Sequence, residues 1–420
     1  MIDLFHQNRE PITHFIWRIS QLLMKDGINF LIFIFAAKLL IPYEFGIFNY
    51  VMALVFFFIL FGDFGISVAA SKFVAEYDAT DKDKIAYVLF NSALVICVFS
   101  AGCCLLLILI GPHFLKEQFP YVLCVIPTMF LAPLTSLYDG IYRGLRQFKK
   151  LSLISMTTGI VSLALIYWLI KSYGLWGTLI AQNLFYFLLL LGLGLFHRGN
   201  RCVLHRPILK TIGTYALIIG TIHVSAFLYT RVDTLVLGYF GFITEINYYE
   251  IVNKFLMLML MPFLVAAQVQ APNVVALYSG ENRPLVLGKM KKYVQWVSLF
   301  SALAILATYL AAPYILQGFF PEYLSPAMLL ITNTFLLLFF FQNVSNFVGN
   351  TFIVSTGHAK INMINIIIFG LLNVVLDVFL VQKTGFMGIA YAKIIVVIPA
   401  CASLLFFYHR ALAKSARVRR

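Results

Sequence analysis

Residues 85–111 read IAYVLFNSALVICVFSAGCCLLLILIG and contain no charged side chain. A helix needs about 20 residues to cross the ~30 Å hydrocarbon core of a bilayer, and this run is long enough. Its apolar residues are continuous rather than alternating, which excludes a strand of a transmembrane barrel. Within lipid, only a helix then satisfies every backbone hydrogen bond of the segment. The stretch therefore predicts a membrane-spanning helix.

Similar segments fill the rest of the chain. Twelve can be identified, at about 17–41, 46–70, 85–111, 118–141, 151–171, 175–196, 211–240, 246–271, 292–316, 324–350, 361–382 and 386–408. Of the 420 residues, 61% are hydrophobic and 11% are charged, whereas a soluble chain carries charge at about a quarter of its positions. This composition excludes a soluble enzyme, a disordered chain and a secreted disulfide scaffold. It predicts an all-α integral membrane protein with about twelve transmembrane helices.

The basic residues predict the orientation. With both termini in the cytoplasm, 23 of the 31 Lys and Arg residues fall on the cytoplasmic side, 4 on the outer side and 4 within spans. Such an excess marks cytoplasmic loops. It also accounts for the net charge of +14 without a nucleic-acid partner, because the charge is spread over six loops and a tail.

The chain has an internal repeat. YGLWGTLIA (173–181) matches TGFMGIAYA (384–392) at a separation of 211 residues, and the turn PYEFGIFNY (42–50) corresponds to FITEINYYE (242–250). The longest polar connection, 197–210, lies near the midpoint. We therefore expect two six-helix lobes, 1–200 and 201–420, which run in parallel because each has an even number of spans.

Four motifs resemble a known family: KLLIPYEFGIFNYVMALV (38–55), DFGISVAASKFVAEYD (63–78), YRGLRQFKK (142–150) and YTRVDTLVLGYFG (229–241) followed by EINYYEIVNKF (245–255). They are similar to the bacterial polysaccharide-biosynthesis flippases, the O-antigen transporter family. Its superfamily also holds the multidrug and toxin extrusion pumps. The resemblance implies two bundles around a central cavity and a working monomer. It further implies an undecaprenyl-diphosphate-linked oligosaccharide that moves from the cytoplasmic to the periplasmic leaflet.

Charged residues inside spans are the candidate site, because such charges usually face a cavity or a partner. In the first span Lys25 and Asp26 either line the cavity or clamp neighbouring helices. Asp63 is a candidate proton or cation site, or a partner of Lys25 or Arg231. Asp139 in the fourth span accompanies a stripe of asparagines in the tenth and eleventh spans, which either join helices or line a wet cavity.

In the second half, Arg231 and Asp233 are two residues apart, so on a continuous helix they point to different sides and each needs another partner. Arg231 is the candidate for the substrate's diphosphate, because a guanidinium matches phosphate bidentately. The alternative is a fixed salt bridge to Asp63, Asp139 or Asp377. Glu250 and Lys254 are spaced to pair with each other. Lys393 in the last span is a candidate partner of Asp377.

The leading hypothesis is a lipid-linked oligosaccharide flippase of the bacterial inner membrane, with H⁺ or Na⁺ as a candidate coupling cation. A drug/cation antiporter of the same superfamily is the alternative, but Lys25, Arg231 and Lys254 favour an anionic substrate. An integral-membrane polysaccharide polymerase or ligase ranks third, because the short outer connections offer few acids or bases. The sequence contains no HExxH, GxSxG or GxxxxGKS motif and predicts no metal site or cofactor.

Overall fold

The structure is a computed structural model that describes residues 9–195, 203–279 and 283–417. These residues form helices and no strand. Their contacts divide the chain into two compact units, Met1–Val224 and Ser225–Arg420, here called the N-terminal and C-terminal units. The division falls inside a helix, whereas the sequence placed the lobe boundary in the polar connection before it.

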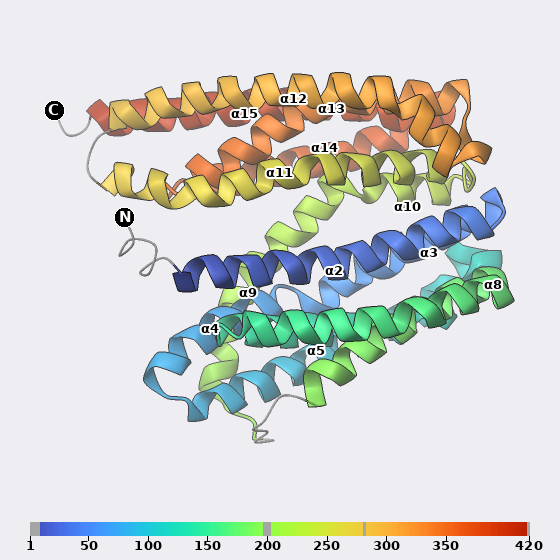
Figure 1. Cartoon of the computed structure of the whole chain (residues 1–420), viewed down its shortest axis with the longest axis horizontal. Helices are drawn as coiled ribbons and strands as arrows, with labels where there is room; N and C mark the ends of the chain where they lie inside the picture. The colour runs from blue at the N-terminus through green and yellow to red at the C-terminus, as the bar shows by residue number, and fades with distance from the viewer. Residues whose placement is uncertain (1–8, 196–202, 280–282, 418–420) are drawn as a thin grey trace. The chain divides into compact units, whose positions relative to one another are not determined.

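The N-terminal unit consists of α2 (Arg9–Leu39), α3 (Pro42–Asp63), α4 (Ile66–Thr80), α5 (Asp83–Leu115), the 3₁₀ turn η1 (Lys116–Gln118), α6 (Phe119–Val125), α7 (Thr128–Gly144), α8 (Phe148–Leu195) and most of α9 (Arg206–Thr230). The C-terminal unit continues from the end of α9 through α10 (Val232–Tyr239), α11 (Ile246–Ser279), α12 (Arg283–Phe319), η2 (Pro321–Tyr323), α13 (Pro326–Val348), the π-helical turn η3 (Gly349–Ile353), α14 (Ala359–Thr384), η4 (Gly385–Met387) and α15 (Gly388–Arg417). Figure 1 labels most of these helices in chain order.

Eight helical stretches of the described residues are long and apolar enough to cross a membrane. Four of them run for 39 to 54 residues, which is far more than the ~20 residues that one crossing takes. The outer surface of α5 is strongly apolar: Leu105, Leu106 and Leu109 are 59%, 50% and 66% exposed. Apolar side chains displayed at this density would drive aggregation in water, but they suit contact with acyl chains.

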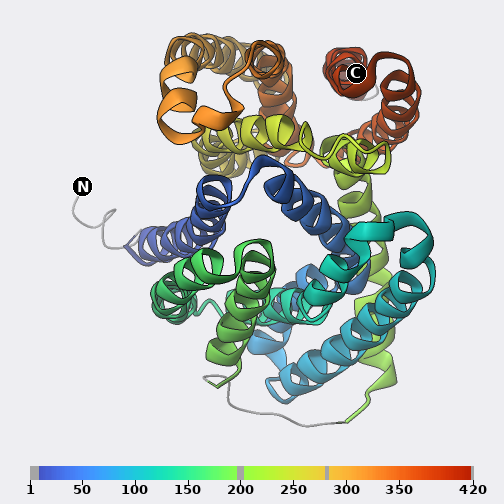
Figure 2. The same cartoon turned by 90° about the vertical axis from the view of Figure 1, so that its right-hand side faces the viewer.

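The repeat predicted from sequence reappears as two matching turns. Gly174 interrupts α8 with φ 54°, and Gly385 ends α14 with φ 65°, a backbone region that glycine enters without steric cost. Three residues later, a Cβ on Gly177 would lie 1.9 Å from the Leu169 carbonyl oxygen, and one on Gly388 would lie 2.4 Å from the Leu380 carbonyl carbon. Both helix pairs therefore reverse direction by the same glycine chemistry. The α14 and α15 pair is seen end-on in Figure 2.

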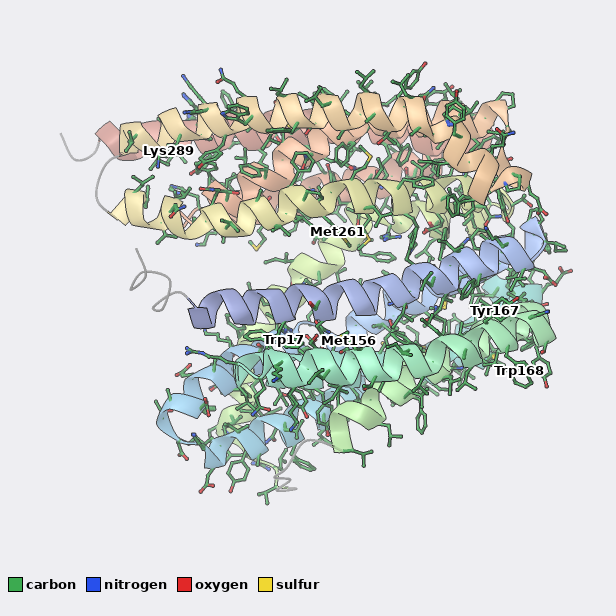
Figure 3. The ribbon with its side chains drawn as sticks, viewed as in Figure 1. Trp17, Met156, Tyr167, Trp168, Met261 and Lys289 are labelled. Atoms are coloured by element: carbon green, nitrogen blue, oxygen red, sulfur yellow. The ribbon has the colours of Figure 1, made fainter. Side chains whose placement is uncertain are left out.

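Aromatic side chains gather around the Gly174 turn. Tyr167, Trp168, Tyr173 and Trp176 are all exposed there. Figure 3 shows Tyr167 and Trp168 on α8 well away from Met156 on the same helix. Exposed Trp and Tyr mark the membrane–water interface, because their rings are apolar and their tips are polar.

The span expected at 46–70 is broken rather than continuous. Phe64 and Gly65 take left-handed conformations, with φ 36° and 80°, and α3 gives way to α4 there. A Cβ on Gly65 would lie 2.8 Å from the Ala216 carbonyl oxygen, and one on Gly220 would lie 2.6 Å from the Phe64 ring. The break therefore packs directly on α9, which is why most of α9 belongs to the N-terminal unit.

Candidate functional site

The site is built around an interruption between α9 and α10. α9 ends at Thr230, Arg231 has φ −133° and ψ −10°, and α10 begins at Val232. The sequence pattern predicted one continuous helix here, and this prediction is wrong. A helix end leaves its last carbonyl groups without intrahelical donors and carries a partial negative charge. The break thus presents the carbonyl oxygens of Leu228 and Tyr229 to neighbouring helices.

Lys393 of α15 binds at this break. Its ammonium donates to the Tyr229 carbonyl oxygen at 2.8 Å and pairs with Asp233 Oδ1 at 2.8 Å. The Lys393 and Asp233 side chains are 3% and 2% exposed. The sequence offered Asp377 as the partner of Lys393, but the ion pair forms with Asp233, because α10 turns its first residues toward α15 after the break.

α14 supplies the remaining groups from one face. Gly370 has no Cβ, and one placed there would lie 2.8 Å from the Ser225 carbonyl oxygen, so α14 approaches α9 very closely. One turn later, Asn373 Nδ2 donates to the Leu228 carbonyl at 3.2 Å, to Asp233 Oδ1 at 3.3 Å and to Asp377 Oδ2 at 2.8 Å. Asn373 and Asp377 are both fully buried. The glycine thus brings the amide and the second carboxylate to the break.

Arg231 itself points to a different acid. Its Nη1 lies 3.3 Å from Glu250 Oε2 on α11, and the Thr234 hydroxyl donates to Glu250 Oε1 at 2.7 Å. The arginine is therefore compensated, but by Glu250 rather than by Asp63, Asp139 or Asp377. Its side chain remains 38% exposed, whereas that of Glu250 is 8% exposed. The guanidinium is therefore bound to Glu250 through Nη1, while part of the side chain stays accessible to a ligand.

Glu250 contacts Arg231, a partner that the sequence did not name, and its pairing with Lys254 stays a prediction. Lys254 lies four residues further along α11, is half-buried and has contacts of its own. Glu250 turns toward α10 because both Arg231 and Thr234 lie there within hydrogen-bonding distance. A charge-assisted contact with a buried carboxylate is stronger than an exposed pair of helix neighbours, which contributes about 0.2–0.5 kcal/mol.

The candidates in the N-terminal unit are engaged locally. Asp63 Oδ1 accepts from the Ser67 backbone N–H at 3.0 Å and from the Ser67 hydroxyl, so it satisfies the first turn of α4 after the break. Asp139 is buried on α7, accepts from Gln21 Nε2 at 3.1 Å and pairs with Arg143 Nε at 2.8 Å. Neither is among the groups collected at the α9–α10 break. The side chains of Lys25 and Asp26 lie outside what the structure describes.

The sequence named Asp233, Asp377 and Lys393 but could not bring them together at one point. The break between α9 and α10 brings together residues 229, 233, 373 and 393. The sequence has no proline or glycine at this point, so the break could not be predicted. The only signal nearby was Gly370, three residues before Asn373, and its meaning depends on which helix it faces. The two carbonyl groups carry no sequence signal at all.

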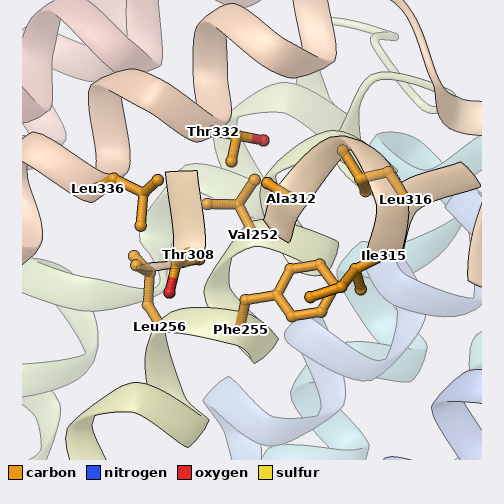
Figure 4. A pocket seen from close by; sticks show the side chains of 9 residues that line it. All are labelled: Val252, Phe255, Leu256, Thr308, Ala312, Ile315, Leu316, Thr332 and Leu336. Atoms are coloured by element: carbon orange, nitrogen blue, oxygen red, sulfur yellow. The ribbon is translucent and has the colours of Figure 1, made fainter. Parts of the chain in front are cut away.

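A small cavity lies elsewhere in the C-terminal unit, between α11, α12 and α13 (Figure 4). Its lining is aliphatic or aromatic except for Thr308 and Thr332. The Thr332 hydroxyl already donates to the Met328 carbonyl at 2.8 Å, and the Thr308 hydroxyl lies 3.3 Å from Met259 Sδ. With no charged group in its lining, this cavity has nothing to bind an anion. Within the described ranges, no group of three His, Cys, Asp or Glu side chains has a metal-binding arrangement.

Solved structures share this fold. An inward-facing multidrug resistance MATE family transporter of the MOP superfamily aligns with TM-score 0.77 and 16% identity, over 95% of this chain and 99% of that one. The lipid II flippase MurJ in an inward closed conformation aligns with TM-score 0.72 and 18% identity, over 95% and 87%. A MOP superfamily transporter from Pyrococcus furiosus aligns with TM-score 0.63 and 17% identity, over 95% of each chain. The protein is thus a multi-pass membrane protein with the fold of the MOP-superfamily transporters.

The family follows from the sequence. The profile of the polysaccharide biosynthesis protein family matches residues 13–277, which is more than half of the chain, and the protein belongs to that family. The family predicted from the four motifs is therefore confirmed. No curated protein sequence matches the chain at a significant level. The family is thus one of polysaccharide biosynthesis, and the fold is one that solved transporters share.

Proposed function

We propose that the protein is a flippase that moves an undecaprenyl-diphosphate-linked oligosaccharide, such as an O-antigen repeat unit, from the cytoplasmic to the periplasmic leaflet by alternating access. The observation that carries the proposal is Arg231, a permanently charged side chain at a helix break in a membrane span. It has one acidic partner at 3.3 Å and 38% of its surface accessible. Membership of the polysaccharide biosynthesis family supports a sugar-bearing substrate. The likeness to MurJ, a lipid II flippase, supports a lipid-linked one.

The membrane arrangement belongs to the same proposal. The division of α8 at Gly174, the glycine turn between α14 and α15, and the pairing of α3 with α4 and of α9 with α10 are compatible with twelve crossings in two six-helix bundles around a central cavity. We place both termini in the cytoplasm of a bacterium and the chain in its inner membrane, on the 23:4 distribution of basic residues. The working unit is taken as a monomer, with H⁺ or Na⁺ as the candidate coupling cation.

Glu250 holds the arginine while the site is free of substrate. A guanidinium in mid-membrane costs about 2.5–3.5 kcal/mol on insertion scales, and a carboxylate partner reduces this cost. An incoming diphosphate offers two parallel charge-assisted hydrogen bonds, whereas the single contact with Glu250 is long for a charged pair. The substrate therefore competes with Glu250 for the same side chain, and Arg231 exchanges one anion for another without becoming unpaired.

The test uses proteoliposomes with a fluorescent undecaprenyl-diphosphate oligosaccharide, and it measures how much of the sugar becomes accessible to a lectin on the far side. Arg231→Ala is expected to abolish transfer. Arg231→Lys is expected to reduce it roughly tenfold or more, because an ammonium keeps the charge but loses the fork. Arg410→Ala, which removes an exposed arginine of α15, is the matched control and is expected to transfer normally.

The alternative within the superfamily is a drug/cation antiporter, which the likeness to the multidrug transporter fold favours. The same proteoliposomes loaded with ethidium distinguish the two functions. Ion-driven ethidium transport without lipid-linked sugar transfer would establish the antiporter. Normal sugar transfer by a well-folded Arg231→Ala protein would remove the diphosphate role while leaving the flippase function standing.

A further inference from the structure

The cluster at the α9–α10 break has the composition of a cation site. Asp233 and the Tyr229 carbonyl oxygen, at the negative end of the α9 dipole, both contact Lys393, and the Asn373 amide joins Asp233 to a second acid, Asp377. Discontinuous helices in transporters bind monovalent cations with such carbonyl groups. Asn373 adds an amide oxygen. Among the described residues, Asn373 Oδ1 is buried and has no hydrogen-bond partner, and the Asp377 and Asp233 carboxyl groups lie within hydrogen-bonding reach of each other.

The position that a cation would take is held by a side chain. Lys393 Nζ is 2.8 Å from the Tyr229 carbonyl oxygen and 2.8 Å from Asp233 Oδ1, with its side chain 3% exposed. An isolated buried ammonium costs several kcal/mol of desolvation, so it persists only where oxygens of opposite charge compensate it. The two oxygens that the ammonium contacts belong to α9 and α10, and the lysine comes from α15, so one charge joins three helical elements.

We propose that Lys393 is a tethered cation, which fills the oxygen cage at the α9–α10 break so that the C-terminal unit needs no Na⁺ or other free monovalent cation to hold these helices together. The inference goes beyond the proposed function and does not depend on which substrate is carried. It implies that Lys393 conceals a Na⁺ site. If the ammonium is removed and space is left, two buried acids, an amide oxygen and a backbone carbonyl oxygen surround a position that a small cation can occupy.

The experiment measures the melting temperature of purified protein in detergent, in sodium chloride and in choline chloride of equal ionic strength. Wild-type protein is expected to melt at the same temperature in both salts. Lys393→Ala is expected to melt lower in choline chloride and to rise by roughly 5 °C or more in saturating Na⁺, as for a ligand that binds only the folded state. Lys383→Ala removes an exposed lysine of α14 and is expected to show no difference between the salts.

Two results would overturn the proposal. One is a wild-type protein that Na⁺ stabilises over choline as much as it stabilises Lys393→Ala, since the lysine would then not be what fills the cage. The other is a folded Lys393→Ala protein that Na⁺ does not stabilise, since Lys393 would then be an ordinary ion pair. If Lys393→Ala does not accumulate, the double variant Lys393→Ala/Asp377→Asn leaves one buried carboxylate instead of two, and it must show the same rise in Na⁺. Because the readout is thermal stability, a failed flippase assay would not affect the outcome.

Discussion

The pairing of Asp233 with Lys393 can be tested by a double-mutant cycle with Asp233→Asn and Lys393→Met. At an effective dielectric constant of about 20, two unit charges at the observed 2.8 Å attract by roughly 6 kcal/mol, and desolvation of the pair offsets part of this. Removing one partner of a buried pair typically costs about 3–5 kcal/mol. The structure separates the two variants. Asp233→Asn leaves Asp377 near the ammonium, so the loss of unfolding free energy is expected at or below the lower end of that range. Lys393→Met leaves the Asp233 carboxylate buried beside a second acid with no cation near either, and its cost is expected at the upper end of that range.

The double variant retains one acid of the cluster, Asp377, and no ammonium. Its loss of unfolding free energy should therefore be smaller than the sum of the losses in the two single variants. We expect a coupling energy of about 2–4 kcal/mol, well above the ~0.6 kcal/mol average for hydrogen bonds between membrane helices. The assay is unfolding in mixed micelles with increasing dodecyl sulfate, followed by tryptophan fluorescence. Asp233→Asn combined with Lys383→Met is the control cycle and should be additive, because Lys383 is exposed and lies over the Phe379 ring. A coupling below about 0.5 kcal/mol between Asp233 and Lys393 would refute the reasoning.

Gly370, Asp63 and the orientation of the chain can be tested in the same way. Gly370→Ala should cost about 1–3 kcal/mol in the same unfolding assay, because a Cβ would lie 2.8 Å from the Ser225 carbonyl oxygen; an unchanged midpoint would mean that α14 can shift freely. Asp63→Ala should cost about 1 kcal/mol through the lost Ser67 N–H contact, and Asp63→Asn should keep both stability and transport if the contact is purely structural; lost transport in a stable Asp63→Asn protein would instead support an ion-coupling role. Single cysteines beside Lys116 and Lys383 should react with an impermeant thiol reagent from the periplasm, while those beside Lys149 and Lys291 should not; periplasmic labelling beside Lys149 would overturn the orientation.

Much of the architecture follows from local properties of the chain. A run such as 85–111 has no stable alternative to a helix in lipid, so the segments could be recognised from hydropathy alone. The turns at Gly174 and Gly385 could be recognised as a sequence repeat, because a turn with a positive φ value favours glycine in both halves of the chain. The family was also readable, because its motifs are contiguous. Hydropathy, glycine turns and family motifs each depend on residues that are adjacent in the sequence, which is why they could be predicted from it.

The sequence by itself determined which charges lie in the membrane, but only the tertiary structure decided how they pair. Lys393 forms its ion pair with Asp233, whereas the sequence offered Asp377, and Arg231 forms its ion pair with Glu250, a partner that the sequence did not offer. The physical reason is that a buried charge is paired across helices, at distances fixed by how closely the helices pack. That packing depends first on the helix break at Arg231, where the sequence has no proline or glycine that would predict a break. It depends also on the close approach of Gly370 to Ser225, a residue far away in the chain.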